Sequence, residues 1–338
     1  MKRIIIALLI GLIGSCANSV FAAPAFSYFE SSGSRSTVKK SVKIGNFNKI
    51  EASTAIKVIF IQGKATGVAQ ITTTESASPY LRVETDDKVL KIYYSKRRPK
   101  NHSINGPTIV TIQAPVLNSI DLSNAASFVC KGTLNVKGNL NIDLSSSSKV
   151  TIPTVRSTSL NIDLSSSASV DIDRIETSEI SIDTSSASSV NIDEVLVPTL
   201  KIDSSSSSSV NIRNFSGHVL DVDCSSVSKV QVNNTDASTF DLDCSSLAKI
   251  NIKGMDAETV NASVYSQGVV SLSGYIRNMN RDLGSQGKIK IDTPDTPKSQ
   301  KKVSRSSSSS SSYSRSSSTK NKTSKTSRKK NPVPTQAP

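Results

Sequence analysis

Aspartate recurs at a fixed spacing through the middle of the sequence, and this pattern is the one that most suggests chemistry. Six copies stand twenty residues apart: Asp143, Asp163, Asp183, Asp203, Asp223 and Asp243. Stacked carboxylates beside serine hydroxyls offer the oxygen ligands that Ca²⁺ prefers. Alternatively, each aspartate caps a chain turn by accepting a hydrogen bond from the backbone N–H two residues on, where every copy has a serine. The choice depends on the fold around them.

The same carboxylates raise the question of catalysis, because many polysaccharide lyases and pectin-degrading hydrolases are β-helices. Such enzymes gather an acid, a base and an Arg or Lys in a cleft. Here the copies are nearly uniform, and only two histidines occur, His102 and His218. Equivalent aspartates do not supply one acid and one base unless their environments differ. We expect no catalytic residue and no cofactor, with a polysaccharide-acting β-helix enzyme (lyase or hydrolase) as the alternative.

The aspartates belong to a repeat whose apolar residues alternate with polar ones. Each copy carries two apolar pairs, of which Leu140/Ile142 and Val150/Ile152 are the first examples. This period of two places the apolar side chains on one face of an extended chain. One short strand cannot bury that face, but strands stacked about 4.8 Å apart, one repeat per turn, form a continuous apolar column. The sequence predicts an all-β fold, a parallel β-solenoid (β-helix) of about eight coils over residues 118–274.

The segments on either side of the repeat should cover its open ends. Residues 42–115 form the N-terminal β part, with strands expected at Ile56–Ile61, Val68–Thr72, Leu81–Glu84, Val89–Tyr94 and Thr108–Gln113. Turn-like joints at Gln62–Gly67 and at residues 86–88 predict hairpins between the strands that they connect. At the other end, Tyr275–Ile291 is the expected closing strand.

Two cysteines share one inward column of the predicted coils. Cys224 and Cys244 occupy the position of Leu144 and Leu164 in successive copies. They are close enough to form a disulfide in an oxidising compartment, or they serve as buried thiols in the core. Cys130 matches the column of Ile152 and is expected in the core as well.

The N-terminus has the features of an export signal. Lys2 and Arg3 precede an apolar run at Ile4–Gly14, and cleavage after Ala22 would make residues 1–22 a signal peptide. Ile13–Cys16 also resembles a bacterial lipobox, in which Cys16 would carry a lipid anchor, the one expected contact with a membrane. We expect residues 23–41 to be a linker. The location is then the periplasm, the outer-membrane surface or the exterior, with secretion favoured over the lipoprotein.

The C-terminal segment, residues 292–338, is rich in Ser, Lys and Arg, and this composition predicts disorder. Of the formal net charge of +14, eleven units lie after Asp295 and two in the signal segment, which leaves +1 for the rest. These basic residues include Lys298, Lys301, Lys302, Arg305, Lys329 and Lys330. The tail either contacts anionic envelope material or is a solvated linker. No sequence-specific recognition of nucleic acid is expected.

Residues 42–291 resemble a known family. The segments Ile44–Ile50 and Ile56–Gly63, followed by Leu81–Val83 and Leu90–Ile92, are similar to the start of the head GIN domain of bacterial exported proteins, often labelled putative autotransporter adhesins. The family's turns commonly contain glycine, whereas serine stands at Ser145–Ser148. The resemblance implies a β-solenoid in the cell envelope. We predict a non-enzymatic, adhesin-like binding or structural module that contacts a surface glycan or an anionic envelope component; the oligomeric state stays open.

Overall fold

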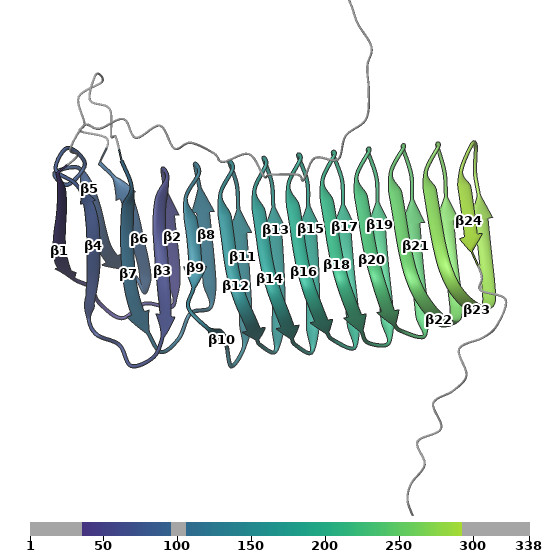
Figure 1. Ribbon diagram of the computed structural model, residues 1–338, viewed down its shortest axis with the longest axis horizontal. Helices are drawn as coiled ribbons and strands as arrows, with labels where there is room; N and C mark the ends of the chain where they lie inside the picture. The colour runs from purple at the N-terminus through teal and green to yellow at the C-terminus, as the bar shows by residue number, and fades with distance from the viewer. Residues whose placement is uncertain (1–35, 96–105, 293–338) are drawn as a thin grey trace, which may run out of the picture. The chain divides into compact units, whose positions relative to one another are not determined.

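The computed structural model describes residues 36–95 and 106–292, and within these ranges it contains strands and turns but no helix. All of them belong to one compact unit, Met1–Pro297. Cys16 and the basic residues of the tail lie outside the described residues. The predicted all-β solenoid is confirmed: parallel strands stack in two ladders along one axis (Figure 1).

The N-terminal part, which lies at one end of the stack, contributes the first seven strands. They are β1 (Thr37–Lys43), β2 (Lys49–Ser53), β3 (Ile56–Gln62), β4 (Val68–Thr74), β5 (Leu81–Asp86), β6 (Val89–Tyr94) and β7 (Thr108–Ala114). Strand β1 overlaps the stretch in which the sequence suggested a linker, and it pairs antiparallel with β4.

The repeat and the segment after it supply the remaining strands. They are β8 (Ser119–Ser123), β9 (Ser127–Cys130), β10 (Thr133–Asn135), β11 (Asn139–Leu144), β12 (Lys149–Arg156), β13 (Ser159–Leu164), β14 (Ser169–Glu176), β15 (Glu179–Thr184), β16 (Ser189–Leu196), β17 (Thr199–Ser204), β18 (Ser209–Ser216), β19 (Val219–Cys224), β20 (Lys229–Asp236), β21 (Thr239–Cys244), β22 (Lys249–Val264), β23 (Val269–Leu283) and β24 (Lys288–Asp292).

Each coil contains one strand in each ladder, and equivalent residues are paired from coil to coil. Leu140 lies beside Leu160 in the first ladder, and Val150 beside Val170 in the second. All four side chains are fully buried, so the alternating pattern does form one continuous apolar column. The expected single closing strand at Tyr275–Ile291 is instead two strands, since the end of β23 and β24 make a further coil.

A tight turn of four residues joins the two strands of a coil. In the first regular copy, Ser148 N donates to Ser145 O (3.2 Å), and Ser146 and Ser147 have φ angles of 52° and 64°. Two successive left-handed residues are typical of a type I′ turn, which favours Asn-Gly. Serine adopts this conformation here because the turns are bonded to one another: Ser147 N donates to Ser166 O of the next coil (2.9 Å).

The N-terminal part follows a spatial order that differs from its chain order. The β2–β3 coil lies between β6–β7 on one side and β8–β9 on the other, with parallel pairing throughout. The hairpin predicted at residues 86–88 is confirmed, since β5 and β6 pair antiparallel. The hairpin predicted at Gln62–Gly67 is wrong, because β7 lies between β3 and β4 and pairs with both.

Candidate functional site

The repeated aspartates form one straight column on the outer face of the first ladder. Asp121 is paired with Asp143, and the column continues through every copy to Asp243. The six predicted residues are all exposed. Partial burial and the neighbouring carboxylates of Asp121 and Asp163 raise the pKa of Asp143. Burial, Asp203 and Asp243 likewise raise the pKa of Asp223. Like charges therefore lie next to one another along the column.

The predicted capping role of these aspartates is wrong. The backbone N–H two residues on is already used between coils: Ser145 N donates to Leu122 O (3.0 Å), and Ser165 N to Leu144 O (2.9 Å). A parallel ladder continues through this position, so the N–H points along the stack and not toward the carboxylate. As for Ca²⁺, no group of three or more His, Cys, Asp or Glu side chains in the described ranges is arranged to hold a metal ion.

The opposite outer face carries amide side chains that bond to one another. Asn191 Nδ2 donates to Asp171 Oδ1 (2.9 Å), and Asn211 Nδ2 donates to Asn191 Oδ1 (3.1 Å). Lys149 pairs with Asp171 at 2.7 Å. Each amide still has an N–H and a carbonyl lone pair to offer, so the face is flat, regular and able to form hydrogen bonds.

The three cysteines of the described ranges are buried and free. The pairing of β19 and β21 places Cys224 beside Cys244, as the repeat predicted. Cys224 Sγ lies 3.1 Å from Ser228 Oγ, and Cys244 Sγ donates to Ala248 O (3.3 Å). Burial raises the pKa of Cys130 and of Cys244 to about 11. In this form the thiols are core side chains with little nucleophilic character.

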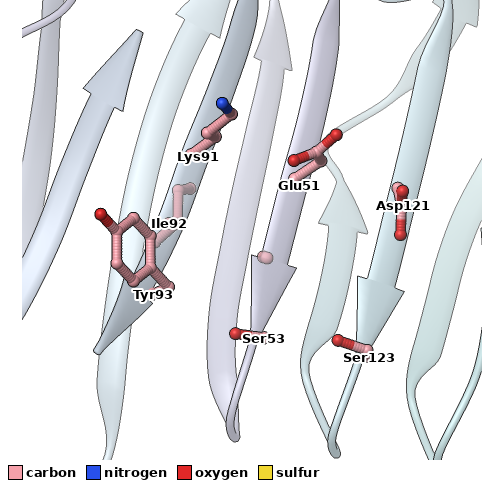
Figure 2. Close-up of a pocket in the computed structure, with 8 residues that line it drawn as sticks. Glu51, Ser53, Lys91, Ile92, Tyr93, Asp121 and Ser123 are labelled. Atoms are coloured by element: carbon pink, nitrogen blue, oxygen red, sulfur yellow. The ribbon is translucent and has the colours of Figure 1, made fainter. Parts of the chain in front are cut away.

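A hollow of about 270 Å³ opens at the N-terminal end of the aspartate column. Figure 2 shows its side chains on three neighbouring strands, with Lys91 and Tyr93 on β6, Glu51 and Ser53 on β2, and Asp121 and Ser123 on β8. We call this feature the N-terminal hollow. Its residues cannot be recognised as neighbours from the sequence, because they come together only through the inserted β2–β3 coil.

The charged groups of the N-terminal hollow are already paired. Lys49 Nζ lies 2.8 Å from Glu51 Oε1 and 3.2 Å from Asp121 Oδ2. Its hydrogen bond with Glu51 is the main reason why the pKa of Lys49 is raised. Lys91 Nζ pairs with Asp86 Oδ2 at 2.8 Å. Glu51 and Asp121 thus share one ammonium, which leaves one negative charge in excess and gives the two carboxylates similar surroundings, not the contrasting ones that an acid–base pair needs.

The comparison with known families agrees with this architecture. Residues 46–239 and 215–324 match the family described as "Putative auto-transporter adhesin, head GIN domain". The chain belongs to this family. The head GIN resemblance noted in the sequence is therefore confirmed. Among curated proteins, none matches the chain.

Two solved structures are similar to this head GIN protein in fold. A structure titled putative adhesin from Parabacteroides distasonis is 20% identical, with a TM-score of 0.56; 77% of this chain and 98% of that chain are covered. A structure titled putative lipid binding protein from the same species is 17% identical, with a TM-score of 0.51 and the same coverage. Within the described ranges, no helix of the head GIN protein is long and apolar enough to cross a bilayer.

Proposed function

We propose that this head GIN protein is a non-enzymatic, adhesin-like module of the cell envelope, exported from the cytoplasm, that binds a surface polysaccharide through its polar outer faces. The observation that carries the proposal is a row of equivalent polar side chains on the second ladder. Each member is paired with its copy in the next coil, in the order Asp171, Asn191, Asn211 and Gln231. A polymer that lies along the stack meets the same hydrogen-bonding group at each coil. Many weak bonds then add to a useful affinity.

Co-sedimentation of the full chain with peptidoglycan sacculi, chitin and cellulose tests this function. The double variant Asn191→Ala/Asn211→Ala should bind the preferred polymer about 3- to 10-fold more weakly, because two lost hydrogen bonds of about 0.5 kcal/mol each remove about 1 kcal/mol in total. The control Ser206→Ala/Ser207→Ala changes exposed side chains on the turn edge of the stack. Equal binding by both variants, or no sedimentation of the wild-type chain with any polymer, would contradict the proposal.

The basic tail, residues 298–338, supports a second contact with anionic envelope material. Attraction of this kind weakens as salt rises, whereas hydrogen bonding by a neutral face does not. We expect a chain without residues 298–338 to lose the binding to lipopolysaccharide vesicles seen at low salt. If the truncated chain attaches to the vesicles as well as the full chain, the tail has no such role.

The enzyme alternative would use the N-terminal hollow, where Glu51 and Asp121 lie near Lys49. We expect no catalysis, because the two carboxylates share one cation and differ little in environment. Incubation with pectin, alginate and peptidoglycan should release neither reducing ends nor unsaturated sugars. Release of either product that is lost in Glu51→Gln would establish the alternative.

A further inference from the structure

The position of Tyr93 sets the N-terminal hollow apart from the rest of the outer face. Ile92 pairs with Ala52, so the next residue, Tyr93, lies level with Ser53. Ser53 in turn pairs with Ser123 on the other side. From Ser123 onward, serine holds this position in each coil as far as Ser245. The Tyr93 ring therefore forms one side wall of the hollow and lies level with Ser53 and Ser123, the small side chains of its floor (Figure 2).

The wall is held in place by a hydrogen bond. Tyr93 Oη donates to Glu84 Oε1 at 2.7 Å, across the β5–β6 hairpin. Glu84 is the main cause of the raised pKa of Tyr93, which therefore stays a neutral phenol. An aromatic side chain fixed in this way offers an apolar face to a ligand without losing much side-chain entropy.

The charges of the hollow decide which class of ligand fits. Lys49 joins Glu51 and Asp121, and Lys91 is paired with Asp86. An anionic ligand would have to displace a carboxylate from Lys49 or Lys91, and it would be repelled by the excess negative charge. A neutral ligand would not, because each carboxylate keeps lone pairs, each ammonium keeps N–H groups, and Ser53 and Ser123 present hydroxyls. Hydroxyl groups, which both donate and accept, match this mixture.

We propose that the N-terminal hollow binds one uncharged pyranose unit, with the C–H face of the sugar against the Tyr93 ring and its hydroxyls on Glu51, Asp121 and Ser123. This assignment rests on the proposed polysaccharide-binding function and adds a site on the outer face of the first ladder, opposite the amide row of the second ladder. Sugar units spaced along a polymer would continue from the hollow over the serine positions of the next coils, which are about 4.8 Å apart. The hollow is open, so a single unit binds weakly, with a dissociation constant on the order of 1 mM.

Saturation-transfer NMR on the full chain, with the methyl glycosides of glucose, galactose, mannose and N-acetylglucosamine as probes, tests the site. Tyrosine fluorescence gives an independent titration, because the chain has no tryptophan. Tyr93→Ala should lower the affinity for the preferred glycoside about 10-fold, the equivalent of losing one good contact. Tyr93→Phe keeps the ring but loses the hydrogen bond to Glu84 that holds it, so its loss of affinity should be clearly smaller than that of Tyr93→Ala, about 2- to 3-fold.

Tyr265 provides a matched control, since it holds the same position at the far end of the serine series. Tyr265 N donates to Cys244 O just as Ser245 N donates to Cys224 O, and Tyr265 Oη donates to Asp282. Tyr265→Ala should leave glycoside binding within about 2-fold. A second pair of variants, Ser123→Gln and Ser205→Gln, fills the floor of the hollow or a distant site in the same series, and only the first should reduce binding.

Several outcomes would overturn the proposal: no saturation transfer to any glycoside, equal losses in Tyr93→Ala and Tyr265→Ala, or preferential binding of the charged controls glucuronate and glucosamine. Circular dichroism of each variant separates lost binding from lost folding. If polymers co-sediment equally with the wild-type chain and with Tyr93→Ala, the site is wrong while the proposed function stands. If no polymer binds but the glycoside binds in a Tyr93-dependent manner, the function is wrong and the site stands.

Discussion

Asp223 and Asp171 lie on the two outer faces of the solenoid, and their surroundings shift the pKa of the two carboxyl groups in opposite directions. Burial and the carboxylates of Asp203 and Asp243 raise the pKa of Asp223. Burial alone would also raise the pKa of Asp171, but hydrogen bonds from Lys149 and Asn191 outweigh it, and this pKa is lowered. The carboxylate of Asp223 thus opposes folding at neutral pH, whereas that of Asp171 favours it.

Asp223→Asn should therefore stabilise the protein at pH 7, by about 0.5 kcal/mol once solvent screening of these exposed groups is allowed for. Because the folded state keeps the Asp223 proton to a higher pH than the unfolded chain, the wild-type protein loses stability as pH rises between the two pKa values. The gain from the substitution should vanish below that range and shrink in high salt. Urea midpoints at pH 3 and pH 7 measure it.

Asp171→Asn is the control for this comparison. The lowered pKa of Asp171 means that its contribution is present at neutral pH and is lost as pH falls through the folded pKa. The substitution should therefore lower the urea midpoint at pH 7 or leave it unchanged. A rise equal to that of Asp223→Asn would contradict the difference between the two faces.

At the scale of elements, the turns repeat one strained conformation with different side chains. Position 207 is serine with φ of 67°, and the equivalent position in the next coil is Val227 with φ of 73°. Valine is β-branched and rarely adopts positive φ, and its side chain here is 57% exposed. The strain is tolerated because neighbouring turns hold each other, with Val227 N donating to Ser246 O (3.1 Å).

Val227→Gly should accordingly stabilise the protein by about 1 kcal/mol, since glycine adopts this φ without strain. Ser207→Gly, at the same position one coil earlier, should give a smaller gain, because serine is not β-branched. Ser209→Gly lies at the start of β18 and should destabilise, as glycine weakens a strand. Urea denaturation followed by circular dichroism ranks the three variants, and a loss of stability in Val227→Gly would disprove the strain argument.

At the scale of the whole solenoid, the two ends differ in how they avoid pairing with other molecules. At the N-terminal end, the edge strand β1 is antiparallel and carries Lys39, Lys40 and Lys43. At the end formed by β23, Arg281 pairs with Ala262 and so takes a position that is apolar and buried in the preceding coils. Arg281 itself is exposed, and a charge in this register interrupts the apolar column and disfavours the addition of a further coil from another molecule.

Arg281→Leu should promote concentration-dependent self-association, because it extends the apolar column to the open edge. Arg277→Leu is the matched control: Arg277 is on the same strand but faces outward, where it pairs with Asp256 at 3.1 Å. Sedimentation velocity over a range of concentrations should show association of the first variant only. Association of both variants to the same extent would mean that any added exposed leucine has this effect.

The sequence by itself determined the coil, the direction of each repeated side chain and the neighbours in each column, including Cys224 beside Cys244. It could do so because a period of two fixes the buried face of a strand, and an exact twenty-residue spacing fixes the register. Only the tertiary structure decided the order of the N-terminal strands. Alternation identifies β3, β4 and β7 but not their partners, since any of them can complete the ladder. The N-terminal hollow depends on that order, because Lys91, Glu51 and Asp121 meet only when the β2–β3 coil lies between two later segments of the chain.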